Sequence, residues 1–317
     1  MDEKELPILS VVMPCYNEQE VLPKTAEVIQ NKLQVLIGRG KIKKESFVLL
    51  VDDGSHDETW NLIRKLNQEN KFFRGIKLAH NSGHQNALLA GLLYAKDHSD
   101  CTISIDADLQ DDISVIDEFI DRYHDGADIV YGVRKERKTD SVFKRSTAHF
   151  FYKLLKVLGV DIIYNHADYR LASKRVLDCL EEFGEINLFL RGIFPLIGFH
   201  SEIVYYNRNE RAAGESKYPF KKMVSFALDG ITSFSIKPLR LITSVGFIIF
   251  VLAFICSIWA IAEYFTNHTL HGWVSTVLPI YFIGGIQLLS LGIIGEYIGK
   301  IYRETKKRPR FIIEQQL

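Results

Sequence analysis

Two long apolar segments near the end of the chain constrain its architecture more than any other feature. Residues 241–262 and 274–295 contain no Asp, Glu, Lys or Arg. A helix of 22 residues is about 33 Å long, at about 1.5 Å per residue, and the hydrocarbon core of a bilayer is about 30 Å thick. We therefore expect a hairpin of two transmembrane helices that anchors the preceding part of the chain to a membrane.

The charges that flank these segments predict their orientation. Lys237 and Arg240 precede the first segment, six Lys or Arg residues lie between 300 and 310, and the loop 263–273 contains none. By the positive-inside rule, both termini face the cytoplasm and the loop faces outward. The chain starts without the basic and apolar regions of a secretion signal. We expect a protein of the cell membrane whose N-terminal domain is cytoplasmic.

Overall composition excludes one functional class. The 39 basic and 39 acidic residues cancel, and the N-terminal part has no Lys/Arg-rich arm. Nucleic-acid binding is therefore not expected. The four cysteines are scattered without the spacing of a metal site, which indicates reduced, structural thiols.

Strand and helix patterns alternate through the first part of the chain. Apolar runs predict strands at 8–13, 47–51, 74–78, 101–105 and 128–131, with helices at 18–37, 58–70, 85–96 and 113–124. This alternation predicts an α/β fold with a mostly parallel sheet, covered on both faces, and ligands at the carboxyl ends of the strands.

Three regions follow from these patterns. Residues 1–217 are expected to form one cytoplasmic domain, and residues 218–240 an amphipathic segment in the membrane interface, with an ordinary core helix as the alternative. Residues 241–317 would hold the two membrane helices and a basic tail lying against anionic headgroups.

Acidic residues cluster where predicted strands end. The clusters are Asn17-Glu18, Asp52-Asp53 and Asp106-Ala107-Asp108-Leu109-Gln110. Carboxylates one residue apart can share a hard cation such as Mg²⁺ or Mn²⁺, which in turn holds substrate phosphates. Helix capping is the alternative for such acids. The glycine-bearing turn 81–87 before a predicted helix is either an anion site or a simple helix start.

These clusters carry a resemblance to a known family. The stretch Pro14-Cys15-Tyr16-Asn17-Glu18, the Val51-Asp52-Asp53-Gly54-Ser55 segment and the Asp-Ala-Asp-Leu-Gln motif resemble glycosyltransferase family 2. The last motif is similar to that of the polyprenyl-phosphate branch, which contains bactoprenol glucosyltransferases and dolichyl-phosphate mannose synthases. The resemblance implies a GT-A-type nucleotide-binding domain. It also implies metal-dependent, inverting transfer of a sugar to undecaprenyl phosphate for cell-envelope glycosylation.

The bactoprenol-type layout favours UDP-glucose as the donor, with UDP-N-acetylglucosamine and GDP-mannose as alternatives. An alternative of another class is a catalytically inactive, membrane-tethered scaffold that binds a sugar nucleotide. A processive polysaccharide synthase is disfavoured because the chain lacks a Gln-x-x-Arg-Trp motif and further membrane segments.

The resemblance also implies roles for individual residues. The nucleotide-sugar pocket would use Pro14, Tyr16, Glu18, Asp52 and Asp106. The metal would be held by Asp106, Asp108 and Gln110, with Asp108 essential to catalysis, and the acceptor phosphate by Arg134, Arg145, Arg211 and Lys217. Asp168 would be the general base or would orient sugar hydroxyls or Arg170. A phosphate monoester has a second pKa near 6, so the acceptor is already largely a dianion at neutral pH and needs no base.

The expected partners follow from this reaction. They are a nucleotide sugar, a polyprenyl phosphate and the bilayer, with a flippase and a periplasmic or extracellular glycosyltransferase acting on the product. Gly284, Gly285, Gly292 and Gly295 would permit close helix packing, within the hairpin or in a homo-oligomer.

Overall fold

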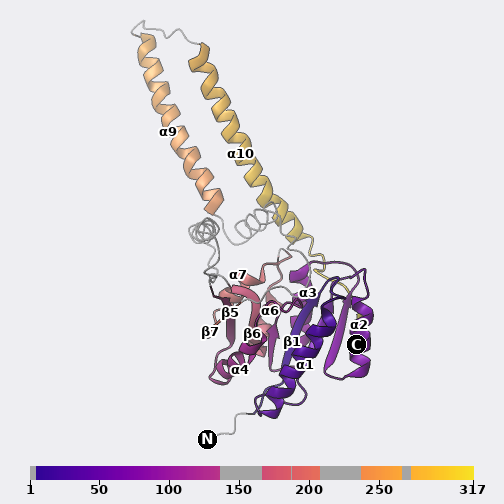
Figure 1. Ribbon diagram of the computed structural model, residues 1–317. Coiled ribbons are helices and arrows are strands. Elements are labelled where there is room, and N and C mark those ends of the chain that lie inside the picture. Colours follow the sequence, from indigo (N-terminus) through magenta and orange to yellow (C-terminus); the bar gives the residue numbers. More distant parts are fainter. Residues whose placement is uncertain (1–4, 136–165, 187, 208–236, 266–272) are drawn as a thin grey trace. The chain divides into compact units, whose positions relative to one another are not determined.

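A computed structural model describes residues 5–135, 166–186, 188–207, 237–265 and 273–317 (Figure 1). The chain divides into two compact units. The first comprises Met1–Tyr152, Asp161–Tyr218 and Arg308–Leu317, and the second comprises Lys153–Val160 and Pro219–Lys307.

The first unit is built on one sheet, whose eight strands in the described residues have the order β7-β5-β6-β4-β1-β2-β3-β8. The strands are β1 (Leu9–Cys15), β2 (Phe47–Asp52), β3 (Phe73–Leu78), β4 (Cys101–Ser104), β5 (Ile129–Arg134), β6 (His166–Ser173), β7 (Ser201–Tyr206) and β8 (Ile313–Gln316). Strand β1 runs parallel to β2 and β4, as β2 does to β3 and β5 to β7. The predicted mostly parallel sheet is confirmed, and β6 and β8 are its antiparallel members.

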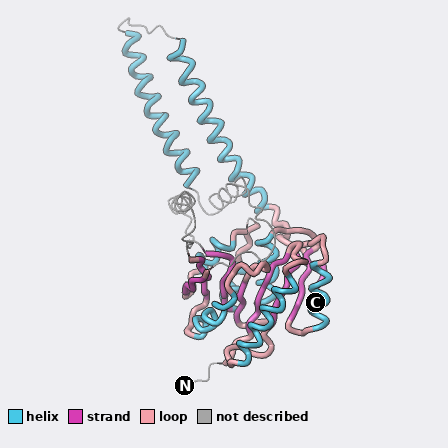
Figure 2. Tube along the Cα trace, viewed as in Figure 1, coloured by secondary structure: helices cyan, strands magenta, loops and turns pink. Residues whose placement is uncertain are grey.

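Helices follow the strands in the predicted alternation (Figures 1 and 2). They are α1 (Leu22–Gly38), α2 (Thr59–Glu69), α3 (His84–Lys96), the 3-10 turn η1 (Ile113–Val115), α4 (Ile116–His124), α6 (Lys174–Glu182) and α7 (Leu190–Ile197). Every residue of β1 and β2 is buried, as expected for strands that are covered on both faces.

Close packing fixes α3 against the centre of the sheet. A Cβ atom at Gly91 would lie 2.4 Å from Val12 of β1 and 2.8 Å from Val51 of β2, so only glycine fits there. Residues of β1 that point the other way, such as Met13, share a core cluster with Leu22 and Ile29 of α1. The core therefore lies in two layers, one on each face of the sheet.

The second unit contains α9 (Lys237–Phe265) and α10 (Trp273–Thr305). These helices include both predicted apolar segments and extend beyond them. Among the described residues, one stretch, Phe282–Thr305, is long and apolar enough to cross a membrane. Of the predicted interfacial segment 218–240, residues 218–236 lie outside the described residues. Its last four residues, 237–240, form the start of α9.

The C-terminal tail differs from expectation. We expected residues after Lys306 to lie against lipid headgroups, but residues 313–316 pair with β3 as strand β8. An edge strand presents unpaired backbone groups. Here the Ala79 amide donates to Ile312 O at 2.9 Å and the Leu317 amide to Gly75 O at 2.8 Å, so the tail satisfies these groups.

Candidate functional site

The strand order places a topological switch point at the carboxyl ends of β1 and β4. Strands β2 and β3 lie on one side of β1, and β4 lies on its other side. The connections that leave β1 and β3 therefore run in opposite directions along the sheet. Ligands of open α/β sheets bind at such a switch point. We call this end of the sheet the carboxyl edge. The residues that bound it include Pro14, Tyr16, Glu18, Asp52, Asp106, Asp108, Gln110, Arg134 and Asp168.

The loops after β1 and β2 are joined by hydrogen bonds. The Asn17 amide donates to Ser55 Oγ at 3.0 Å, the His56 amide donates to Asn17 Oδ1 at 2.9 Å, and the Glu18 amide donates to Thr59 Oγ1 at 2.9 Å. Asn17 adopts a positive φ of 54° in making these bonds. Helix α1 begins at Leu22, four residues later than predicted, and the bond from the Glu18 amide holds that residue beside the β2 loop.

Asp52 is a fully buried carboxylate at the end of β2. Its Oδ1 accepts from the Ser55 amide at 3.3 Å, and its Oδ2 has no hydrogen-bond partner among the described residues. Burial raises the pKa of Asp52, and the bonds from Ser55 oppose that rise. A buried acceptor without a donor is costly, so the position suits a ligand that brings an N–H or O–H group. Pro14 is buried nearby on β1, and Tyr16 is exposed.

Asp53 holds the turn before α3 against the end of β2. Its two carboxylate oxygens accept from the amides of Ser82 at 2.7 Å and Gly83 at 3.0 Å. The sequence left the turn before α3 as either an anion site or a simple helix start. In the structure the anion that its two amides bind is the carboxylate of Asp53 from the same chain. Gly54 lies between with φ +65°, and a Cβ atom there would come within 2.6 Å of the Asn81 and His80 backbone.

The loop after β4 carries the predicted metal ligands. Asp108 Oδ1 accepts from the Gln110 amide at 3.1 Å, and Leu109 between them has φ 57°. Burial, together with the carboxylates of Asp111, Asp168 and Asp108, raises the pKa of Asp106 to about 6, and His84 opposes the rise.

The predicted metal ligands, Asp106, Asp108 and Gln110, all carry oxygen donors. Within the described part of the chain, no group of three or more His, Cys, Asp or Glu side chains is close enough to hold a metal ion. The predicted set has two carboxylates and the amide of Gln110, and oxygen donors of this kind suit Mg²⁺ or Mn²⁺. Burial is the main cause of the raised pKa of Asp106, and a cation would offset the further contribution of the neighbouring carboxylates. The donors therefore fit a hard divalent cation.

Arg134 ends β5 at the same edge and is held from two sides. Its Nη2 lies 3.0 Å from Asp111 Oδ1, and its Nε donates to Tyr206 Oη at 3.1 Å. Tyr206 in turn donates to Asp111 Oδ1 at 2.5 Å. Burial lowers the pKa of Arg134, but Asp111 and Tyr206 raise it further, so the guanidinium stays charged. The structure thus places a fixed cation beside the loop after β4.

Asp168 lies at the start of β6 and is the most contacted carboxylate of the site. Arg170, Arg191 and Gln85 donate to it, and His84 Nε2 lies 3.7 Å from its Oδ2. Sequence reasoning did not identify Arg191, which comes from α7. Three other predicted phosphate-binding residues, Arg145, Arg211 and Lys217, lie outside the described residues.

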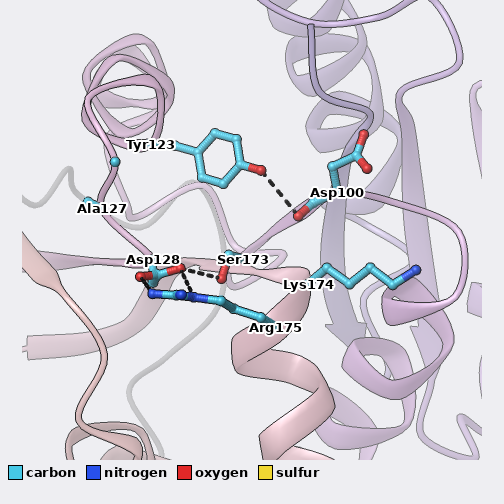
Figure 3. Close-up of a pocket in the computed structure, with 8 residues that line it drawn as sticks. Asp100, Tyr123, Ala127, Asp128, Ser173, Lys174 and Arg175 are labelled. Carbon is cyan, nitrogen blue, oxygen red and sulfur yellow. Dashed lines mark hydrogen bonds and ion pairs between the residues drawn. The ribbon is translucent and has the colours of Figure 1, made fainter. Parts of the chain in front are cut away.

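A cavity of about 360 Å³ lies at the opposite, amino-terminal end of β4 and β5, between Asp100, Tyr123 and Lys174 (Figure 3). In Figure 3 the Arg175 guanidinium lies along the Asp128 carboxylate, to which it is paired. Asp128 also accepts from Ser173 Oγ at 3.1 Å. These polar groups satisfy one another, so the carboxyl edge is the stronger candidate.

Comparison with known proteins decides the family. The profile described as glycosyl transferase family 2 matches residues 10–181, more than half of the chain. The chain belongs to this family. The resemblance drawn from the acidic motifs is confirmed, and this family 2 glycosyltransferase has the expected GT-A-like α/β fold. A second profile, described as the GtrB C-terminal hairpin, matches residues 237–301, which contain α9 and most of α10. That match indicates association with a membrane.

Relatives align over almost the whole glycosyltransferase. The uncharacterized glycosyltransferase YkoT of Bacillus subtilis (strain 168) is 54% identical and covers 98% of this chain and 92% of its own. The prophage bactoprenol glucosyl transferase homolog of Escherichia coli (strain K12) is 38% identical and covers 97% and 98%. The bactoprenol glucosyl transferase of Shigella phage SfX is 37% identical and covers 97% and 99%.

Proposed function

We propose that this glycosyltransferase transfers glucose from UDP-glucose to undecaprenyl phosphate at the cytoplasmic face of the cell membrane. The observation that carries the proposal is the extent of the relationship. Relatives named bactoprenol glucosyl transferase align with 97% of this chain, across both the carboxyl edge and the helical hairpin. Such an alignment supports both a donor site at the carboxyl edge and an acceptor held at the membrane.

The donor pocket is proposed at the ends of β1 and β2. Asp52 Oδ2 would accept from the imide N–H of uracil, since it is buried and has no donor among the described residues. Glu18 would accept from ribose hydroxyls. Pro14 and Tyr16 would complete the pocket, with Asp106 at its far side.

Asp106, Asp108 and Gln110 would hold a Mg²⁺ or Mn²⁺ ion beside the diphosphate. When bound, the cation supplies positive charge to the departing diphosphate. Gln110 contributes an oxygen without adding to the negative charge that already surrounds Asp106.

The acceptor phosphate is proposed to meet Arg134, together with Arg145, Arg211 and Lys217. Guanidinium groups bind phosphate oxygens in pairs, and Arg134 is held in a fixed position by Asp111 and Tyr206. A phosphate oxygen of the lipid forms a bond to the anomeric carbon. The bond from that carbon to the UDP oxygen breaks on the opposite face, and UDP leaves with the electron pair, so the configuration inverts.

A two-span topology is supported by strand β8. Because β8 pairs with β3, the tail lies on the same side of the membrane as the sheet. The chain must then cross the membrane an even number of times between β7 and β8, and α9 and α10 together supply two crossings. The positive-inside rule makes that side cytoplasmic. The lipid-linked sugar would then require a flippase and an outer glycosyltransferase.

Product analysis tests the proposal. The purified full chain is incubated with undecaprenyl phosphate, Mg²⁺ or Mn²⁺, and labelled UDP-glucose, UDP-N-acetylglucosamine or GDP-mannose. We expect a glucosylated lipid from UDP-glucose and none without the cation. A product from either of the other donors alone would replace the donor assignment. Nucleotide binding without any product would favour the scaffold alternative.

Replacing one ligand tests the role of the metal. Asp108→Asn should abolish product while the protein stays folded, because the remaining donors hold the cation poorly. The control, Asp121→Asn, removes an exposed carboxylate of α4 paired with Lys41 and should keep full activity. Full activity of Asp108→Asn would refute the proposed metal site.

A further inference from the structure

Helix α7 is fixed to the carboxyl edge at its first turn. The Leu190 amide donates to Gln85 Oε1 at 3.1 Å, and Gln85 Nε2 donates to Asp168 Oδ2 at 3.3 Å. One glutamine of α3 therefore links the start of α7 to the carboxylate on β6. The next residue of α7 is Arg191, so its position depends on this linkage.

Arg170 holds Asp168 from the interior. Its side chain is 1% exposed, its guanidinium stacks on Phe194 at 4.3 Å, and its Nη2 lies 2.5 Å from Asp168 Oδ1. Its Nη1 donates to Leu190 O at 3.4 Å. This buried cation already pairs with the single charge of Asp168.

Arg191 approaches the same carboxylate from the solvent side. Its Nη2 lies 2.9 Å from Asp168 Oδ2 and its Nε lies 3.3 Å from Oδ1, so both carboxylate oxygens are engaged. Its side chain is 31% exposed. Two guanidinium groups share one carboxylate, and Arg191 is the one of the two that solvent reaches, since Arg170 is buried.

This charge lies close to the loop after β4. His84 Nε2 is 3.7 Å from Asp168 Oδ2 and 3.5 Å from Asp106 Oδ1, so one imidazole joins the two carboxylates. Arg191 is thus connected through two residues, Asp168 and His84, to Asp106, which is proposed to face the diphosphate. A partly exposed guanidinium in such a place is suited to binding phosphate oxygens.

We propose that Arg191 binds a phosphate oxygen of the reactants and that Asp168 is a positioning residue for Arg191 rather than the proton acceptor. This inference rests on the proposed function and adds a residue that the sequence motifs do not contain. The phosphate belongs either to the diphosphate of the donor or to the monophosphate of the lipid.

The surroundings of Asp168 argue against a role as base. Both of its oxygens accept from guanidinium groups, and Gln85 adds a further donor. Burial alone would raise the pKa of Asp168, but Arg191, His84 and Arg170 hold it well below its usual range. A general base is most effective with a pKa near the working pH. Asp168 is thus built to remain charged and paired.

Nucleotide binding gives the first test. The binding of UDP and of UMP to the full chain is measured for the wild type, Arg191→Lys and Arg191→Gln. If Arg191 binds the diphosphate, Arg191→Gln weakens UDP binding by at least about 10-fold, the size of one lost charged hydrogen bond, and leaves UMP binding unchanged. Arg191→Lys recovers part of the loss. Retained UMP binding also shows that the variant is folded.

Steady-state kinetics separates the two phosphates. If Arg191 binds the lipid phosphate, Arg191→Gln raises the KM for undecaprenyl phosphate and leaves UDP binding unchanged. The matched control is Arg175→Gln, whose guanidinium pairs with Asp128 at the opposite end of the sheet and should change neither quantity. If Arg191→Gln changes neither UDP binding nor either KM, the proposal is overturned.

Asp168→Asn distinguishes positioning from base catalysis. A positioning role predicts the same affected substrate as in Arg191→Gln, and effects of the two substitutions that do not add in the double variant. A base predicts a fall in kcat of about 10² to 10⁴ with binding unchanged, and that result would overturn this part of the proposal. A wild-type chain that makes no lipid product refutes the proposed reaction, whereas the comparison of UDP with UMP still tests Arg191.

Discussion

The contacts of the Asp168 carboxylate set its pKa and, through that pKa, its contribution to the free energy of unfolding. Asp168 has a pKa held well below its usual range by Arg191, His84 and Arg170, against the effect of burial. In the unfolded chain its pKa would be about 3.9. The folded state therefore binds fewer protons than the unfolded state, and the stabilisation is complete above the unfolded pKa. It is lost as the pH falls through that value toward the folded pKa.

We predict that Asp168→Asn lowers the free energy of unfolding by about 3 to 5 kcal/mol at pH 7, the usual result of removing one partner from a buried ion pair. The deficit should shrink when the pH falls below about 4, because the carboxylate of the unfolded wild-type chain then takes up a proton while the folded one still holds its charge, so the wild type loses this stabilisation. Denaturant unfolding of the purified full chain at both pH values measures this difference. Asp121→Asn, at an exposed pair, should cost less than about 1 kcal/mol. An equal deficit at every pH would contradict the charge-based explanation.

Gly54 gives a second prediction at the level of one residue. A Cβ atom there adds a left-handed backbone penalty of about 1 to 2 kcal/mol and a contact of 2.6 Å with the Asn81 backbone. Gly40 has nearly the same φ, +66°, with no atom within 4 Å of its Cβ position. Gly54→Ala should therefore destabilise the protein clearly more than Gly40→Ala, and only Gly54→Ala should weaken UDP binding. Equal effects in thermal unfolding and nucleotide titration would rule out the contact as the cause.

Strand β8 has the weakest strand pattern in the sequence, yet it covers an edge of the sheet. It covers the edge of β3, where Gln315 Oε1 accepts from the Trp60 indole at 3.2 Å and Glu314 pairs with Lys77 at 2.9 Å. A Cβ atom on Gly75 would lie 3.1 Å from Leu317, so the last residue packs closely on the strand. The tail thus protects a sheet edge that would otherwise offer free backbone groups.

We predict that a chain ending at residue 311 has faster amide hydrogen exchange across β3 and a lower unfolding temperature. The missing residues supply the partner for the Ala79 amide and cover Gly75. Glu314→Gln is the control, because it removes one partly exposed ion pair and leaves the strand in place. Unchanged exchange in the shortened chain would show that β8 does not protect the sheet edge.

Elements with a clear local pattern were predicted from the sequence, and those built by distant contacts were not. The alternating strands and helices up to β5 and the acidic residues at strand ends follow from periodicity and turn chemistry. Arg191 was missed because its environment is assembled by contacts such as that of Gln85 with Leu190, 105 residues away. Strand β8 was missed because four residues without alternation carry no strand signal, and its pairing with β3 spans most of the chain.

For the whole molecule, strand β8 links the sheet to the membrane topology. A strand that follows the hairpin can pair with β3 only if it returns to the side of the membrane where the sheet lies. Two crossings satisfy this condition, and a single crossing does not. The basic residues after α10 and the absence of Lys and Arg from the loop 263–273 agree with this arrangement.

Cysteine labelling in intact cells tests this topology. In a chain with Cys179→Ser and Cys256→Ser, we introduce His268→Cys in the loop between the helices or Lys306→Cys after α10. A membrane-impermeant maleimide should label the loop position in intact cells, and the tail position only after the membrane is opened. Cys15 and Cys101 are buried and should not react while the protein is folded. Labelling of both positions in intact cells, or of the tail alone, would contradict two crossings and would leave the pairing of β8 with the sheet without a topological explanation.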